Sequence, residues 1–182
     1  MADIKRPVKI YNGSDWDKFP PMLNDSVALR ELNFTEFFGI KLLNDVIYNA
    51  DAQNIPLGAT YANMVNTTEY ARITTSSDAD GPGWCKILKT GYYFVFGEIR
   101  VNDTGTNAAF EVKVVASSAG EIANGSGARA WNLRVAAGCC GIAKLTAGEI
   151  LRINVVRTYG GGSYKLEVGK TSMRVYPLYI PD

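Results

Sequence analysis

The sequence predicts an all-β fold of the sandwich or barrel type. From Gly91 onward, apolar side chains alternate with polar ones over short stretches, which is the period of a half-buried strand. Runs rich in glycine, serine and asparagine separate these stretches, as turns separate strands. The 182 residues are 47% hydrophobic and 20% charged, a composition typical of a globular domain with its own core.

The clearest strand begins at Gly91. One of its faces takes the apolar residues Val95, Ile99 and Val101. The other face takes Glu98 and Arg100, which three aromatic residues precede: Tyr92, Phe94 and Phe96. The start of this strand is therefore apolar on both faces, and such a strand is covered on both sides. We predict that Tyr92, Phe94 and Phe96 contact another copy of the chain.

Further stretches alternate in the same way. Their apolar positions lie in the ranges Phe110–Ala116, Trp131–Val135, Leu151–Val155, Tyr164–Val168 and Met173–Val175. A glycine- and serine-rich loop is predicted at Ser117–Gly127, and the glycines 160–162 separate two strands.

The first half of the chain is less regular. Val8–Tyr11 is predicted as a short strand that ends in a turn at Asn12–Ser14. Asn24–Leu32 has the pattern of a short helix. The run Phe34–Tyr48 is densely apolar, and its pattern leaves helix and buried strand both open. Thr74–Gly83 is predicted as a polar, flexible loop.

The chain is expected not to be an enzyme and to need no cofactor or metal. It contains no histidine, which excludes catalysis by a Ser-His-Asp triad and zinc binding through imidazole. No glycine-rich phosphate loop or dinucleotide-binding motif is present, and no carboxylate pair is nominated for glycosidase chemistry. The acidic loop Asp78–Asp80 has oxygen ligands for a divalent cation, although a solvated loop is the favoured interpretation.

Charge and cysteine content limit the partners. A net charge of +1 argues against nucleic-acid binding, which needs a concentrated basic surface. No apolar run suits a membrane span or a secretion signal, so neither membrane insertion nor secretion is expected. The cysteines, Cys85, Cys139 and Cys140, are expected to be buried or half-buried free thiols, with the adjacent pair pointing to opposite faces.

Two elements resemble the signatures of C1q/TNF-like jelly-roll domains. Gly91-Tyr92-Tyr93-Phe94 followed by Ile99 is similar to the Gly-x-Tyr-x-Phe central strand, with Tyr93 and Phe94 at the aromatic positions. Leu145–Ile153 resembles the Leu-x-x-Gly-Asp-x-Ile element, with Glu149 in place of the commoner Asp. The family's Phe-x-Gly near the C-terminus is absent. The resemblance implies a jelly-roll β-sandwich that assembles as a homotrimer.

The N-terminal segment resembles a different group of proteins. Val8–Asp17 is similar to the Val-x-x-Tyr-Asn-Gly-x-x-Trp start of bacteriophage tail, baseplate or head-fibre proteins. This resemblance implies that residues 1–45 form an extended arm that anchors to other virion proteins, and that residues 46–182 form the jelly roll. The expected anchor residues are Tyr11, Trp16 and Phe19.

Together these expectations describe a non-enzymatic subunit of a virion fibre or knob, assembled in the host cytoplasm. Its loops are expected to contact host glycans or proteins, with Asn102, Asp103 and Tyr159 as candidate ligand-binding residues. Five tyrosines are able to stack on sugars, although core or interface roles are favoured for them; they are Tyr92, Tyr159, Tyr164, Tyr176 and Tyr179. A virion-borne polysaccharide-degrading enzyme and a C1q-type recognition or signalling module remain the alternatives.

Overall fold

The computed structural model divides the chain into two compact units, Met1–Phe34 and Thr35–Asp182. It describes residues 9–11, 16–18, 37–48, 52–60, 69–102, 108–129, 135–161 and 163–180. In the first unit, β1 (Lys9–Tyr11) and β2 (Trp16–Lys18) pair as antiparallel strands, with Tyr11 opposite Trp16. The predicted strand at Val8–Tyr11 is therefore confirmed over Lys9–Tyr11. Its first residue, the predicted turn at Asn12–Ser14 and the predicted helix at Asn24–Leu32 lie outside the described residues.

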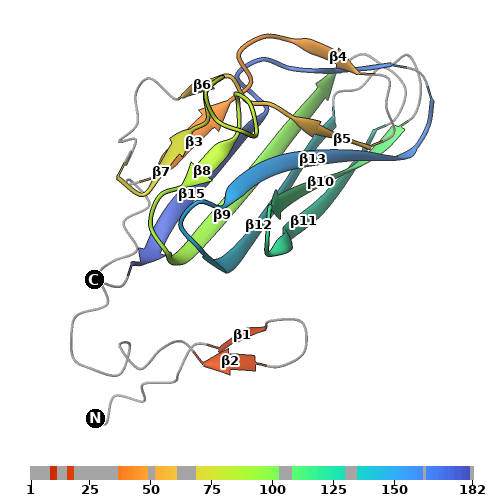
Figure 1. The fold of residues 1–182 in the computed structure, drawn as a ribbon. Coiled ribbons are helices and arrows are strands. Elements are labelled where there is room, and N and C mark those ends of the chain that lie inside the picture. The colour runs from red at the N-terminus through yellow and green to blue at the C-terminus, as the bar shows by residue number, and fades with distance from the viewer. Residues whose placement is uncertain are drawn as a thin grey trace. The chain divides into compact units, whose positions relative to one another are not determined.

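The second unit is all-β over its described residues, as the sequence predicts, and its strands form two antiparallel sheets (Figure 1). The β13 sheet contains β5 (Ala52–Ile55), β7 (Ala71–Ile73), β8 (Cys85–Ile87), β10 (Ala108–Ala116), β11 (Gly120–Arg129) and β13 (Ile150–Tyr159). The β9 sheet contains β3 (Phe38–Lys41), β4 (Val46–Tyr48), β6 (Ala59–Thr60), β9 (Gly91–Asn102), β12 (Val135–Leu145), β14 (Tyr164–Leu166) and β15 (Ser172–Tyr179).

Strand β9 is the centre of its sheet. It pairs along its whole length with β12 on one edge, and with β15 and then β14 on the other. Strand β13 has the same place in its own sheet, with β10 on one edge and both β5 and β8 on the other. Strand β9 therefore sets the register of β12, β14 and β15, and β13 sets that of β5, β8 and β10.

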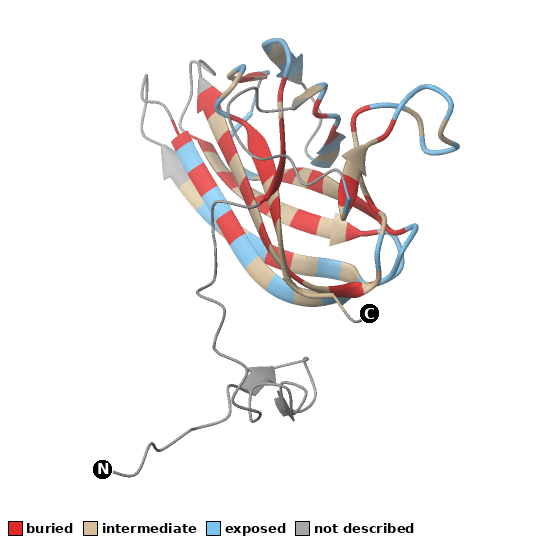
Figure 2. Ribbon diagram, turned by 90° about the vertical axis from the view of Figure 1, so that its left-hand side faces the viewer, coloured by how far each residue is buried: buried red, intermediate tan, exposed pale blue. Residues whose placement is uncertain are grey.

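The core lies between the two sheets. Buried and half-buried residues alternate along β9, β10 and β13, so that one face of each strand is sealed and the other reaches solvent (Figure 2). The largest side chains of the core are fully buried, among them Tyr93, Tyr164, Phe38 and Phe110. The rings of Phe110 and Tyr164 meet edge to face at 5.0 Å between centroids, which joins the two sheets.

The ambiguous run Phe34–Tyr48 contains strands rather than a helix over its described residues, 37–48. Strand β3 pairs with β15, so the sandwich includes residues that the sequence assigns to the N-terminal arm of 1–45. Short strands covered on one or both faces carry no clear period, which explains why the pattern left this run open.

Two expectations are wrong, one about a loop and one about where a strand ends. The glycine- and serine-rich stretch predicted as a loop at Ser117–Gly127 is a turn followed by β11, which pairs with β10 over its whole length. Val168 does not continue the alternation of β14, because that strand ends at Leu166 and the Val168 side chain is 45% exposed.

The glycines of β11 and β12 allow the edges of the two sheets to approach closely. A Cβ atom on Gly125 would lie 2.0 Å from the carbonyl oxygen of Gly138, and one on Gly141 would lie 2.1 Å from that of Ile122. No side chain fits at such separations, so β11 is a strand whose glycines are required by contact with the opposite sheet.

Glu149 ties together two turns at one end of the sandwich. Its carboxylate accepts hydrogen bonds from Ser118 Oγ at 2.7 Å, Ala119 N at 2.9 Å and Thr146 N at 2.9 Å. Burial opposes the charged form, but these donors outweigh it, so the pKa of Glu149 lies below its ordinary value. Glu149 thus holds the turns on either side of it.

We predict that Gly125→Ala destabilises the protein, because the added methyl group meets backbone that cannot move aside. The expected loss is about 1–3 kcal/mol or more of unfolding free energy. Thermal unfolding followed by circular dichroism measures it. Gly161→Ala is the control, since nothing lies within 4 Å of a Cβ there, and a change below about 0.5 kcal/mol is expected. Equal effects of the two substitutions would contradict the close approach.

We also predict that Glu149→Gln lowers stability at pH 7 by about 1–3 kcal/mol, because buried donors lose their charged acceptor. A carboxylate whose pKa is lowered on folding contributes stability that is present above the unfolded-state pKa of about 4.3 and is lost as the pH falls through the folded-state value. The difference in unfolding free energy between the native protein and the variant should therefore become smaller below pH 4. Urea unfolding between pH 7 and 3 tests this, with Glu121→Gln as an exposed control. A difference that stays constant with pH would contradict the role of the charge.

Candidate functional site

The candidate site is the outer face of the β9 sheet, and β9 itself supplies its central row. Tyr93, Val95, Ile99 and Val101 point inward and are buried. Tyr92, Phe94 and Phe96 alternate with them, face outward and are half-buried. The predicted orientation of these three aromatic residues is therefore confirmed. Their contact with another copy of the chain stays a prediction.

Neighbouring strands extend this row into a patch. In the register of the sheet, Phe94 lies between Tyr176 on β15 and Ile142 on β12. The ring of Tyr176 lies 5.6 Å from that of Phe94 and 5.0 Å from that of Phe37. Ile142 is 38% exposed. We call Phe94, Phe96, Ile142 and Tyr176 the aromatic patch; Phe37, which packs against Tyr176, is itself buried.

Arg174 joins the patch to a charged region. Its guanidinium lies 5.5 Å from the ring centroid of Phe96 and 6.0 Å from that of Phe37, distances at which cation–π attraction operates. The same group forms an ion pair with Glu98 at 3.2 Å, and Ser172 donates a hydrogen bond to Glu98 at 2.7 Å. Arg174 is therefore held from two sides, and the outer face passes from aromatic to charged along β9.

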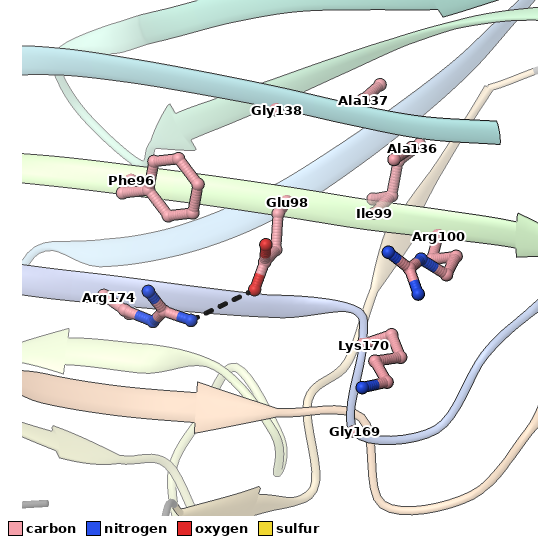
Figure 3. A pocket seen from close by; sticks show the side chains of 10 residues that line it. All are labelled: Phe96, Glu98, Ile99, Arg100, Ala136, Ala137, Gly138, Gly169, Lys170 and Arg174. Carbon is pink, nitrogen blue, oxygen red and sulfur yellow. Dashed lines mark hydrogen bonds and ion pairs between the residues drawn. The ribbon is translucent and has the colours of Figure 1, made fainter.

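A hollow of about 500 Å³ opens in the charged region. The register of the two strands creates this hollow. Gly138 on β12 lies opposite Glu98 on β9, and Ala136 lies opposite Arg100. Long side chains on one strand thus face a glycine and an alanine on the next. Figure 3 shows Phe96 at one end of the hollow, Arg100 and Lys170 at the other, and Glu98 between them.

The described candidate loop residues lie at the ends of strands. Asn102 ends β9 and Tyr159 ends β13, and the two strands end at the same end of the sandwich. Tyr159 is 67% exposed, so it is open to a ligand. Asp103 lies outside the described residues, as does Phe19 among the anchor candidates. For Tyr11 and Trp16 the structure places the backbone in β1 and β2.

The five tyrosines considered for sugar stacking, for which the sequence favours core or interface roles, lie in different environments. Tyr164 is a core residue, fully buried against Phe110. Tyr92, Tyr176 and Tyr179 are half-buried on β9 and β15, while Tyr159 is exposed. A core role is therefore confirmed for Tyr164 alone.

The acidic loop around Asp78 is held by ion pairs. Asp78 contacts Arg72 at 2.6 Å and Lys86 at 3.3 Å, and it accepts a hydrogen bond from the Thr75 backbone. The paired Arg72 and these hydrogen bonds hold the pKa of Asp78 far below its usual range. Within the described residues, no group of three or more His, Cys, Asp or Glu side chains is placed to hold a metal ion.

The cysteines follow the expectation in part. Cys139 is buried and Cys140 exposed, so the adjacent pair does point to opposite faces, although Cys140 is not the buried or half-buried thiol expected. Burial raises the pKa of Cys139 to about 11 and that of Cys85 further, so both thiols stay protonated at neutral pH.

Among the described residues, no helix is long and apolar enough to cross a membrane.

Sequence reasoning missed half of this site. It identified the β9 aromatics but not Phe37, the position of Arg174 over Phe96, or the hollow. The alternation of Met173, Arg174 and Val175 placed Arg174 on the outer face of its strand. Nothing in the sequence shows that β15 is the neighbour of β9.

These two sheets and their strand order define a jelly roll of the type found in TNF structures. The Eiger TNF structure from S. frugiperda aligns with a TM-score of 0.51 at 13% identity, covering 81% of this chain and 96% of that one. Murine APRIL at pH 5.0 aligns with a TM-score of 0.50 at 10% identity, covering 78% and 99%. The globular domain of a zebrafish complement 1qA protein gives 0.49 at 10% identity, covering 80% and 99%.

At these identities the likeness concerns the fold alone. No protein-family model matches the chain, and no curated protein matches its sequence.

Proposed function

We propose that this chain is a non-enzymatic jelly-roll module that assembles as a homotrimer through the outer face of the β9 sheet. The aromatic patch is the observation that carries this proposal. Phe94, Phe96 and Tyr176 are only half-buried, and Ile142 and Cys140 beside them are exposed. A contiguous apolar patch of this kind marks an interaction surface on a folded protein.

Self-association would shield the aromatic patch from water, which a folded protein rarely leaves exposed over a large area. Three copies of one patch around a closed axis would cover each other without leaving a free end. The resemblance to C1q/TNF-like jelly rolls supports three copies.

The setting we propose is a bacteriophage virion, with the module as a fibre or knob subunit. The similarity of Val8–Asp17 to the start of phage appendage proteins supports this. The hairpin of β1 and β2 belongs to a compact unit distinct from the sandwich, as an anchoring segment would. Three copies per knob would multiply weak contacts to host glycans or proteins through avidity.

We predict that the native protein has a mass in solution about three times its chain mass of 19.8 kDa, and that Phe94→Asp reduces it to one chain. An unpaired carboxylate in the centre of an apolar interface is strongly unfavourable. Light scattering with size-exclusion chromatography measures both masses. Tyr159→Asp, at a residue exposed on the other sheet, is the control and should leave the mass unchanged. A native monomer, or an unchanged mass for Phe94→Asp, would overturn the proposal.

The virion setting has separate tests. We expect the gene to lie beside capsid or tail genes, and the purified protein to bind host cells or glycans on an array. Neighbours without virion functions would contradict the setting. Blank arrays with no cell binding would remove adsorption and leave a purely structural role.

A further inference from the structure

We propose that the hollow beside Arg100 binds an acidic saccharide, with Arg100 and Lys170 holding its carboxylate. This inference names a ligand chemistry for the proposed module.

The first argument is charge. Arg100, Lys170 and Arg174 line the hollow together with one carboxylate, that of Glu98, which gives three positive charges against one and a net charge of +2. The entire chain carries only +1. Glu98 pairs with Arg174, and no ion pair is recorded for Arg100 or Lys170 within the described residues. The side chains of Arg100 and Lys170 are thus both available to one anion. Charge-assisted hydrogen bonds to a carboxylate are among the strongest hydrogen bonds in proteins.

The second argument is rigidity. The backbone N–H of Arg100 donates to Thr171 Oγ1 at 3.3 Å, and its carbonyl accepts from Glu167 N at 2.9 Å. The turn that carries Lys170 is closed by hydrogen bonds from Lys170 N and Thr171 N to the Glu167 carbonyl. The backbones of both cationic residues are therefore fixed relative to each other before any ligand arrives, which reduces the cost of ordering the site.

The third argument concerns the rest of the lining and selects a sugar over a bare anion. Glu98 is held by Ser172 and Arg174, and its carboxylate remains an acceptor for hydroxyl donors. Phe96, Ala136 and Gly138 provide an apolar wall. A sugar acid combines a carboxylate, hydroxyl groups and an apolar C–H face, and an inorganic anion lacks the last two.

The hollow also lies apart from the centre of the aromatic patch. Phe94 and Arg100 are on the same face of β9, and six residues separate them by about 20 Å. The two ends of the outer face can therefore serve different partners, with Phe96 at their boundary.

The test is titration of the purified protein with glucuronate, glucose and sulfate, followed by calorimetry or NMR. Glucuronate is expected to bind at least tenfold more tightly than glucose or sulfate. Arg100→Gln and Lys170→Gln should each weaken glucuronate binding three- to tenfold. Gly138→Leu should abolish it by filling the hollow without changing a charge, since a Cβ there meets nothing closer than 3.5 Å. Unfolding curves confirm that each variant is folded.

Two further variants are controls. Lys144→Gln removes a charge at the other end of β12, opposite Tyr92, and should leave binding unchanged. Glu121→Gln, at an exposed residue of β11 in the other sheet, should also bind glucuronate as the native protein does. Because glucuronate binding and the mass in solution are separate measurements, this inference and self-association can fail independently. The inference is overturned if glucuronate does not bind, if sulfate or glucose binds as tightly, if Gly138→Leu retains binding, or if either control variant loses it.

Discussion

The first half of strand β9 is apolar on both of its faces, and this constraint organises the rest of the structure. Its inner face, with Tyr93 and Val95, packs in the core, while its outer face begins with aromatic residues that only neighbouring strands can cover in part. Both edges are hydrogen-bonded, so the side chains opposite β9 are set by register. The outer face therefore takes its character from what β12 and β15 place beside each β9 residue.

The small residues of β12 affect both sides of that strand. Gly141, like Gly125 on the opposing strand, allows β11 to approach so closely that no Cβ would fit, which closes the sandwich along this edge. On the outer side, Gly138 and Ala136 leave the space that becomes the hollow. One run of small residues therefore lets the two sheets approach each other and also leaves space for the hollow. A glycine has no side chain, so it leaves empty the space that a side chain would fill on that face of the strand.

The outer face changes in chemistry along a single strand. At the Tyr92 end it is aromatic, which favours contact with a second protein surface. At the Arg100 end it has excess positive charge around a depression, which favours a small anionic ligand. Arg174 lies between the two regions, attracted to Phe96 and Phe37 by their rings and to Glu98 by its charge. The aromatic region is built on paired strands, and the charged region combines paired strands with the hydrogen-bonded turn that carries Lys170, so backbone hydrogen bonds fix the geometry of both.

The sequence by itself determined the all-β class and the face on which Tyr92, Phe94 and Phe96 lie, because the period of two in a strand is a local property. It misread β11 as a loop, since glycine and serine disfavour strands and only the proximity of β12 explains them there. The tertiary structure alone decided that Phe37 and Tyr176 join Phe94, and that Gly138 stands opposite Glu98. Strand neighbours and register arise from contacts between distant segments, and no local pattern encodes them.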